Sequence, residues 1–422
     1  MPGPDWLARG QGHLWLPYTQ MKTAPPPLPV VAAEGCKLAL ADGRVLIDSI
    51  ASWWTVAHGY SHPHLIGAIE TQARLCAHTM LGGLAQEPAC TLAARLAALS
   101  PGGLDHVFFS ESGSVAVEIA MKIALQYWIN RGERERTRFV SFLGGYHGDT
   151  FAAMSVCDPD EGMHSLFKDA LTPQHIVDLP DTDERLGAFR TRVRAKDIAA
   201  VIVEPLVQGA GGMRMHAPET LAAIAKVCRE AGVLLILDEI FTGFGRTGTT
   251  FACEQAGVVP DLMTVGKALT GGTLPLAATL ARRDVFDAFL SDDPTAALMH
   301  GPTYSGNALA CAAANASIDL FAREPRLEQA LAIEQHLSEA LAPARVLPGV
   351  ANVRVKGAIG VIEFEQVPDV LWLRAAMVKR GVWSKPFGRI LYTTPPFVIT
   401  PDELRQVTDA MLDVARAWCA RR

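Results

Sequence analysis

Several patterns that mark particular protein classes are missing from this sequence. Its 422 residues contain no apolar run that approaches the roughly 20 residues of a membrane span. The first residues, Met1 to Trp6, lack both the basic start and the apolar run of a signal peptide. No block rich in lysine and arginine is present, and the formal net charge is −6, which argues against a nucleic-acid surface. We therefore expect a cytoplasmic protein that binds neither nucleic acid nor membranes.

The sequence also lacks the cysteine and histidine spacing that builds structural metal sites. None of its eight cysteines forms a C-x-x-C pair, so we expect buried free thiols rather than zinc or a disulfide framework. His58, His62 and His64 are close together, but Pro63 separates the last two and no acidic ligand accompanies them. We expect no metal site.

What is present is a long, apolar chain in which predicted strands alternate with predicted helices. Hydrophobic residues make up 49% of it, enough for a large core and two domains. We expect strands at 107–110, 139–142, 199–204, 233–237, 262–265 and 276–280, and helices at 64–80, 87–99, 115–128 and 218–231. This alternation predicts an α/β fold with a mostly parallel sheet.

The two ends of the chain follow a different pattern. Residues 1–33 have little periodicity, and their prolines argue against a helix. A hairpin is expected at 36–50, with its turn at Asp42-Gly43. From about 330, strands at 353–355 and 358–364 and helices at 369–380 and 401–420 predict a smaller α+β unit, which the hairpin is expected to join. The expected domains are 1–60, joining the small domain, 61–320 as the large domain and 321–422 as the small domain.

The stretch from Val233 to Gly272 carries the clearest chemical pattern. One buried strand ends at Asp238, and the next ends just before Lys267. Ligands of open parallel sheets bind outside the carboxyl ends of strands. A desolvated lysine there can attack a carbonyl, and an acid facing a pyridine nitrogen keeps that nitrogen protonated. The G-x-G-x-x-G string at Gly243–Gly248 is rejected as a dinucleotide site because it starts too far beyond its strand and no helix opens beneath it.

Other residues fit a phosphate-bearing aromatic cofactor, although each has a plainer interpretation. Gly113 and Ser114 open a predicted helix, where backbone N–H groups bind phosphate, or where a serine simply caps the helix. Tyr146 follows a strand and either covers a flat ring or packs in the core. Neighbours on a strand face opposite ways, so either Trp53 or Trp54 is expected to face a cavity or a partner chain.

With these residues in view, the chain resembles the class-III aminotransferases, which depend on pyridoxal 5′-phosphate (PLP) and have fold type I. The supporting strings are 15–19, 52–54, 112–118, 145–150, 208–215 and 300–303, together with Asp238-Glu239 and Lys267. Within the class, the Trp-Trp and Gln-Gly-Ala-Gly-Gly strings are similar to the biotin-pathway branch. Ala210 agrees with that branch, since many relatives acting on ω-amino acids have Glu there.

The resemblance implies a role for each matching residue. Lys267 would bind the cofactor covalently and then carry protons, Asp238 would pair with the ring nitrogen, and Tyr146 would stack on the ring. Gly113 and Ser114 would hold the phosphate. Pro302 and Thr303 would reach the phosphate in the site of a second subunit. Tyr18, Trp53 and Gly301 would line the substrate pocket.

The resemblance also implies the substrates and a homodimer with shared active sites. The branch transfers an amino group from S-adenosylmethionine to 8-amino-7-oxononanoate. Its carboxylate-binding arginine falls where this chain has Lys385, and Arg389 is the alternative cation nearby. Another donor such as lysine, another keto acid, and a non-catalytic regulatory protein of the same fold remain open alternatives at this point.

Overall fold

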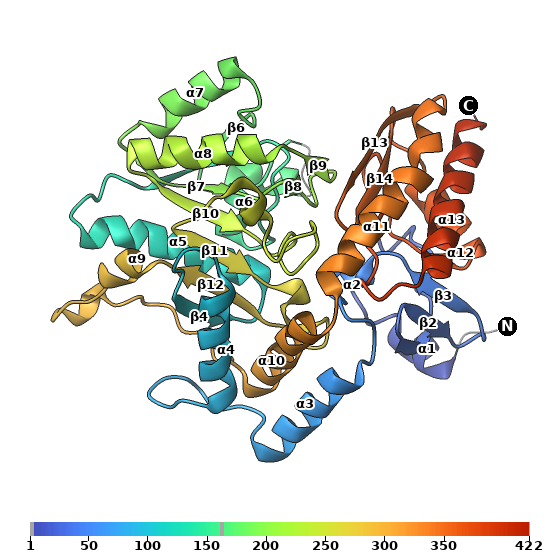
Figure 1. Cartoon of the computed structure of the whole chain (residues 1–422), viewed down its shortest axis with the longest axis horizontal. Coiled ribbons are helices and arrows are strands. Elements are labelled where there is room, and N and C mark those ends of the chain that lie inside the picture. Colours follow the sequence, from blue (N-terminus) through green and yellow to red (C-terminus); the bar gives the residue numbers. More distant parts are fainter. Residues whose placement is uncertain (1–3, 161–163, 422) are drawn as a thin grey trace.

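The computed structural model describes residues 4–160 and 164–421, and its centre is a seven-stranded sheet (Figure 1). The strands lie in the order β4-β12-β11-β10-β7-β5-β6. They are β4 (His106–Ser110), β5 (Arg138–Phe142), β6 (His175–Val177), β7 (Ile198–Val203), β10 (Leu234–Asp238), β11 (Leu262–Val265) and β12 (Ala277–Ala281). Within this sheet β12 alone runs in the opposite direction to the other strands, so the predicted mostly parallel sheet is confirmed.

Helices cover both faces of the sheet, and every residue of β7, β10 and β11 is buried. Successive side chains point to opposite faces. Ile202 and Ile236 pack in one cluster with α5 (Gly113–Asn130), α6 (Phe151–Ser155) and α9 (Arg283–Asp287). Val203 and Leu237 pack in another with α4 (Glu87–Leu99), α7 (Asp183–Val193), α8 (Pro218–Ala231) and α10 (Ala308–Arg323). The uninterrupted apolar runs of these strands follow from this double coverage.

A second group of elements lies beside the large sheet and combines the two ends of the chain (Figure 1). Its C-terminal elements are β13 (Val350–Lys356), β14 (Ile359–Phe364), β16 (Ile390–Thr393), α11 (Arg326–Ala340), α12 (Val370–Lys379) and α13 (Pro401–Cys419). The N-terminal strands β1 (Val30–Glu34), β2 (Lys37–Leu40) and β3 (Val45–Asp48) form a sheet with β15 (Val382–Trp383). The predicted hairpin is therefore confirmed, and its strand β3 pairs in parallel with β15. The exact domain bounds stay a prediction.

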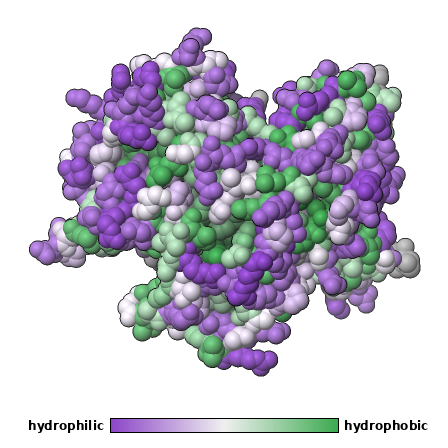
Figure 2. Space-filling model, in the orientation of Figure 1, coloured by the Kyte–Doolittle hydropathy of each residue, from purple (hydrophilic) through white to green (hydrophobic). Residues whose placement is uncertain are grey.

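The remaining elements are short or connect the two groups. They are α1 (Asp5–Gly10), α2 (Ala51–Trp54), α3 (Pro63–Leu75), β8 (Val207–Gln208), β9 (Arg214–Met215), η1 (Ser165–Ala170), η2 (Ala252–Ala256), η3 (Lys267–Thr270), η4 (Pro294–Ala296) and η5 (Ala342–Val346). Figure 2 shows hydrophobic residues gathered around the hollow between the two groups, with hydrophilic residues over the outer helices. Among the described residues no helix is long and apolar enough to cross a membrane.

The structure differs from the sequence-based expectations in three places. The helix expected at 64–80 ends at Leu75, because Cys76 is extended and its carbonyl accepts a hydrogen bond from the Gln72 side chain. The N-terminal segment, expected to be irregular, contains the short helix α1, which begins directly after Pro4 and ends before the later prolines. The two adjacent tryptophans lie in the left-handed turn α2 and not in a strand.

Candidate active site

A cavity lies where the parallel strands β5, β7, β10 and β11 end. Parallel strands share one carboxyl edge, so the residues that follow them meet there. Asp238 is the last residue of β10, and Lys267 comes two residues after β11. The cavity is lined by Trp54, Gly113, Ser114, Tyr146, His147, Gly148, Glu204, Ala210, Asp238, Ile240, Phe241 and Lys267. The predicted meeting of Asp238, Lys267, Tyr146 and the N-terminus of α5 is thus observed.

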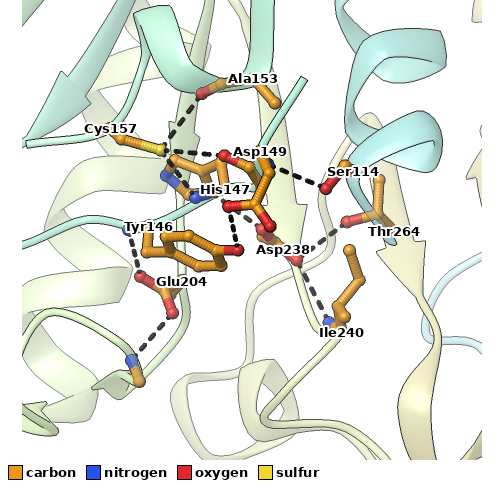
Figure 3. A network of polar contacts seen from close by, with 12 residues as sticks. Ser114, Tyr146, His147, Asp149, Ala153, Cys157, Glu204, Asp238, Ile240 and Thr264 are labelled. Atoms are coloured by element: carbon orange, nitrogen blue, oxygen red, sulfur yellow. Dashed lines mark hydrogen bonds and ion pairs between the residues drawn. The ribbon is translucent and has the colours of Figure 1, made fainter. Parts of the chain in front are cut away.

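Asp238 is held by three hydrogen-bond donors (Figure 3). Its Oδ2 lies 2.8 Å from Nδ1 of the buried His147. Its Oδ1 accepts from the Ile240 N–H at 3.2 Å and from the Thr264 hydroxyl at 3.1 Å. An ionised carboxylate can only accept hydrogen bonds, so this setting fits a charged Asp238 whose orientation is fixed.

His147 is a site residue that the sequence reasoning missed as a functional group. It stands next to Tyr146 in the loop after β5, but the contact that gives it a role joins residues 91 positions apart. Its Nδ1 must carry the proton to donate to Asp238, and its backbone N–H contacts the Cys157 sulfur at 3.1 Å. The Tyr-His pair directly after a strand was the one signal in the sequence that could have indicated it.

Lys267 reaches the cavity from a strained backbone position. Its φ is 47°, an uncommon value for a residue with a side chain. Its Nζ lies 5.0 Å from the centre of the Trp54 ring. Burial lowers the pKa of Lys267 from the usual range, while the charges of Asp238, Glu204 and Asp149 act in the opposite direction. A lysine with a lowered pKa is a better nucleophile toward a carbonyl, as the predicted role requires.

The N-terminus of α5 forms part of the wall of the cavity through Gly113 and Ser114. Ser112 caps the helix by accepting from the Val115 N–H at 3.4 Å, so the capping interpretation applies to Ser112. Ser114 instead faces the next loop, where its Oγ accepts a hydrogen bond from the Asp149 N–H at 3.0 Å. Gly148 packs so closely here that an added Cβ would lie 2.4 Å from the Ser114 Oγ. The first turn of α5 thus presents its backbone N–H groups to the cavity beside a glycine.

Tyr146 is held through its hydroxyl group, which contacts Asp149 and Tyr18, and through its backbone N–H, which contacts Glu204. Its hydroxyl donates to Asp149 Oδ1 at 2.8 Å, and the same oxygen accepts from the Tyr18 hydroxyl. The two tyrosine hydroxyls lie 3.3 Å apart. Burial raises the pKa of both tyrosines above the ordinary value, so both stay neutral donors. Tyr18 therefore lies next to the cavity that Tyr146 lines, as expected of a substrate-pocket residue.

Glu204 is a second buried acid that sequence reasoning did not assign to the site. Its Oε2 accepts from the Tyr146 N–H at 3.0 Å, and its Oε1 accepts from the Gly209 N–H at 2.8 Å. Burial raises the pKa of Glu204 to about 7, against the opposing charge of His147. The carboxylate thereby joins the loop that carries Tyr146 to the loop that carries Ala210 (Figure 3).

Trp53 and Lys385 form a contact at the outer side of the same region. The Lys385 Nζ lies 3.8 Å from the centre of the Trp53 ring, and the Trp53 ring packs edge-on against Tyr18 at 6.2 Å. Partial burial lowers the pKa of Lys385 to about 8, and Arg374 acts in the same direction. Arg389, the alternative cation, pairs with Glu363 at 2.9 Å.

The loop with Gly301, Pro302 and Thr303 does not line the cavity of its own chain. Gly301 and Thr303 are exposed and Pro302 is partly buried. The loop is anchored through Lys122, whose Nζ donates to the Met299 carbonyl at 2.7 Å. These three predicted residues are therefore separated from the others within one chain.

The loop at Gly243–Gly248, rejected as a dinucleotide site, has a packing role around its arginine. Arg246 is 1% exposed, and its guanidinium donates to the carbonyl of Pro395 at 2.8 Å. It also lies 4.6 Å from the centre of the Phe397 ring. These contacts give Arg246 a structural role.

The residues around the cavity fit PLP by the chemistry of their donors. The cavity brings together an amine that suits the aldehyde of PLP and a carboxylate that suits its ring nitrogen. It also has an aromatic side chain that suits the flat ring and a helix N-terminus that suits the phosphate. Glycine suits the close packing at both Gly113 and Gly148, since an added Cβ at Gly113 would lie 3.0 Å from Ile240 and one at Gly148 would lie 2.4 Å from the Ser114 Oγ.

Comparisons with known proteins agree with this geometry. The family model for class-III aminotransferases matches residues 18–415. The adenosylmethionine-8-amino-7-oxononanoate aminotransferase of Mycobacterium leprae is 47% identical over 414 residues, covering 96% of this chain and 95% of that protein. The crystal structure of the enzyme of that name from Methanocaldococcus jannaschii has a TM-score of 0.94 at 34% identity, covering 98% of this chain and 99% of that one.

A solved relative also carries the cofactor. The PLP-bound amine transaminase from an uncultivated Pseudomonas species is 30% identical, with a TM-score of 0.87, and covers 96% of this chain and 99% of that chain. The expected fold type, the aminotransferase activity and the cofactor are thereby confirmed at the level of the family. The chain belongs to the class-III aminotransferases.

Proposed function

We propose that this enzyme transfers an amino group from S-adenosylmethionine to 8-amino-7-oxononanoate, giving 7,8-diaminononanoate in biotin biosynthesis. The observation that carries the proposal is the meeting of Lys267 and Asp238 at adjacent strand ends, in a chain closely similar to enzymes named for this reaction. The same meeting speaks against a non-catalytic regulator, which has no chemical need for a buried lysine. Eight free thiols suit the cytoplasm, where we place the enzyme.

Each residue has a task in the proposed reaction. The bound cofactor acts as an electron sink for the pair released when a proton leaves the amino-bearing carbon. Lys267 holds the cofactor and then carries that proton on its Nζ, which its lowered pKa favours. Asp238, oriented by His147, keeps a proton on the ring nitrogen. Tyr146 covers the ring, and Gly113 and Ser114 bind the phosphate with the first turn of α5.

The acceptor carboxylate is proposed to bind Lys385. No carboxylate of residues 4–160 and 164–421 forms an ion pair with Lys385, whereas Arg389 already pairs with Glu363. Trp53 and Tyr18 connect Lys385 to the cavity, so a chain extending from the reacting carbon passes along both rings. Because Gly301 does not line the cavity of its own chain, the neighbouring subunit is proposed to contribute it to this substrate pocket.

We propose a homodimer in which Pro302 and Thr303 complete the phosphate site of the neighbouring subunit. Supporting this, Thr303 is exposed, and two large apolar neighbours in its loop are exposed as well. Met299 is 67% exposed and Tyr304 is 56% exposed, and apolar side chains gathered at one place on a surface are typical of an interface.

A donor-exchange assay tests the proposed function. Purified enzyme with PLP is incubated with 8-amino-7-oxononanoate and either S-adenosylmethionine or lysine, and 7,8-diaminononanoate is measured by mass spectrometry. Product with S-adenosylmethionine supports the proposal. Product formed with lysine but not with S-adenosylmethionine would make lysine the amino donor. Absence of product with either donor would overturn the proposed acceptor.

A further inference from the structure

The turn α2 has a backbone conformation that residues with side chains rarely adopt. Ala51, Ser52, Trp53 and Trp54 have φ values of 47°, 48°, 58° and 73° in succession. Four left-handed residues in a row form a short left-handed helical turn, which costs conformational energy at every residue that has a Cβ. The surrounding structure must therefore hold this turn in place.

A buried aspartate binds the turn from the end of β3. Asp48 is fully buried, and its Oδ1 accepts from the Ile50 N–H at 2.9 Å. Its Oδ2 accepts from the Ser52 N–H at 2.7 Å and from the Tyr60 hydroxyl at 2.6 Å. The carboxylate thus satisfies two backbone donors at the start of the turn and has its own position fixed by Tyr60.

The turn presents its two tryptophans to two different lysines. Trp54 is buried and faces Lys267 in the cavity, at 5.0 Å from Nζ to ring centre. Trp53 is 36% exposed and carries the Lys385 Nζ at 3.8 Å. The turn therefore stands between the amine at the reacting centre and the cation proposed for the acceptor carboxylate.

The segment that carries Lys385 is attached to the same turn. Ser49, between Asp48 and the turn, donates from its backbone and its hydroxyl to the Trp383 carbonyl at 3.0 Å and 2.8 Å. Trp383 is the last residue of β15, which pairs with β3, and Lys385 follows two residues later. Movement of the turn would consequently disturb both the contact between Lys385 and Trp53 and the hydrogen bonds of Ser49 to Trp383, which hold the Lys385 segment.

We infer that Asp48 is a positioning residue which, by holding the left-handed turn, sets the spacing between Lys267 and Lys385 and thereby the length of acceptor that the enzyme selects. The inference rests on the proposed function for the role of Lys385. A loosened turn lets Trp53 and Lys385 shift relative to Lys267, so acceptors of different length are then distinguished less well.

The test compares acceptors of different length in wild type and Asp48→Asn. The series consists of 8-amino-7-oxononanoate and homologues with one methylene fewer or more between carboxylate and keto carbon. The amide of Asn places an NH₂ group against one of three donors, so at least one hydrogen bond is lost. We expect the ratio of kcat/KM between the favoured acceptor and its homologues to fall roughly tenfold, as the loss of a buried hydrogen bond predicts.

The ratio distinguishes positioning from general stability, because a smaller folded fraction lowers kcat/KM equally for all acceptors. Asp42→Asn is the matched control, since Asp42 is in the hairpin turn and its side chain contacts Arg44. Ser52→Gly in the Asp48→Asn background should restore part of the selectivity, because glycine adopts positive φ without a Cβ clash. An unchanged ratio in Asp48→Asn, with or without a fall in activity, would overturn the inference.

Two further measurements keep the inference testable on its own. If Asp48→Asn does not fold, Tyr60→Phe removes one donor and should lower the same ratio by a smaller factor; an unchanged ratio there contradicts the inference.

Near-ultraviolet circular dichroism of the cofactor-free chain reports the tryptophan environments without any turnover. A changed aromatic signal in Asp48→Asn supports the turn's dependence on Asp48, and an unchanged signal refutes it. Wild type inactive on the whole series would overturn the proposed function instead.

Discussion

Replacing Lys385 by alanine should raise the KM for the acceptor and leave the half-reaction with the amino donor nearly unchanged. The Lys385 ammonium sits on the Trp53 ring, and no carboxylate of the described residues pairs with it. A lost charge-assisted hydrogen bond is worth about 1.5–3 kcal/mol, which corresponds to roughly ten- to a hundredfold in binding. Arg389→Ala should change the acceptor KM much less, because Arg389 is engaged by Glu363.

The pKa of Lys385 adds a second signature to this prediction. Burial lowers that pKa to about 8, so the side chain is charged below pH 8 and loses its charge above it. Acceptor KM should therefore rise as the pH increases through 8 in wild type. In Lys385→Arg the guanidinium stays charged, so this rise should disappear while acceptor binding is kept.

Initial rates at varied acceptor and saturating donor, from pH 7 to 9, measure both effects. The single-turnover rate of the donor half-reaction is the internal control. An acceptor KM that rises only in Arg389→Ala would move the carboxylate site to Arg389 and refute the reasoning. A donor half-reaction slowed as much as the acceptor half-reaction would show that Lys385 supports the whole site rather than the acceptor.

Three other perturbations have expected outcomes. Asp238→Asn should retain bound cofactor, seen by its visible absorbance, but lose most of the rate of proton abstraction, since an amide cannot keep the ring nitrogen protonated; a wild-type rate would contradict the role. Lys267→Ala and Thr303→Ala, mixed and refolded together, should show activity above either parent, because one hybrid site has both native residues; no gain would mean that each site is built from one chain. His58 stays neutral in the fold because burial, followed by the charge of Arg326, lowers its pKa to about 3, whereas the unfolded chain protonates it near 6.5. The free energy of unfolding should therefore fall as the pH drops from 6.5 toward 3, by up to about 1.4 kcal/mol per pH unit from this residue. Chemical denaturation at several pH values should show that this free energy depends less steeply on pH in His58→Asn, and an equal pH dependence in the two proteins would exclude His58.

The sequence predicted the parts of the site that lie at the ends of recognisable strands. Asp238 and Lys267 follow apolar runs that predict buried strands, so their meeting at one sheet edge follows from the parallel topology. The hairpin at Asp42-Gly43 was likewise predictable from its turn residues.

Other parts depend on contacts that no local pattern records. The hydrogen bond from His147 to Asp238 spans 91 residues, and Glu204 acquires its role only when two separate loops fold over it. The left-handed turn at 51–54 contains no glycine, so no residue in it predicts positive φ values. The hydrogen bonds of Asp48 and tertiary packing override the local preference of these residues. The fold was thus more predictable from the sequence than the side-chain contacts that orient the residues of the site.

Lys267 is expected to be the residue that binds the cofactor, and peptide mapping tests this role directly. Borohydride makes the bond between the lysine and PLP permanent, and mass spectrometry of the proteolysed enzyme then locates the added mass. We expect wild type to carry the added mass on Lys267 and Lys267→Ala to carry none on this peptide. Stoichiometric cofactor mass on any other lysine of the wild-type chain would contradict this role of Lys267.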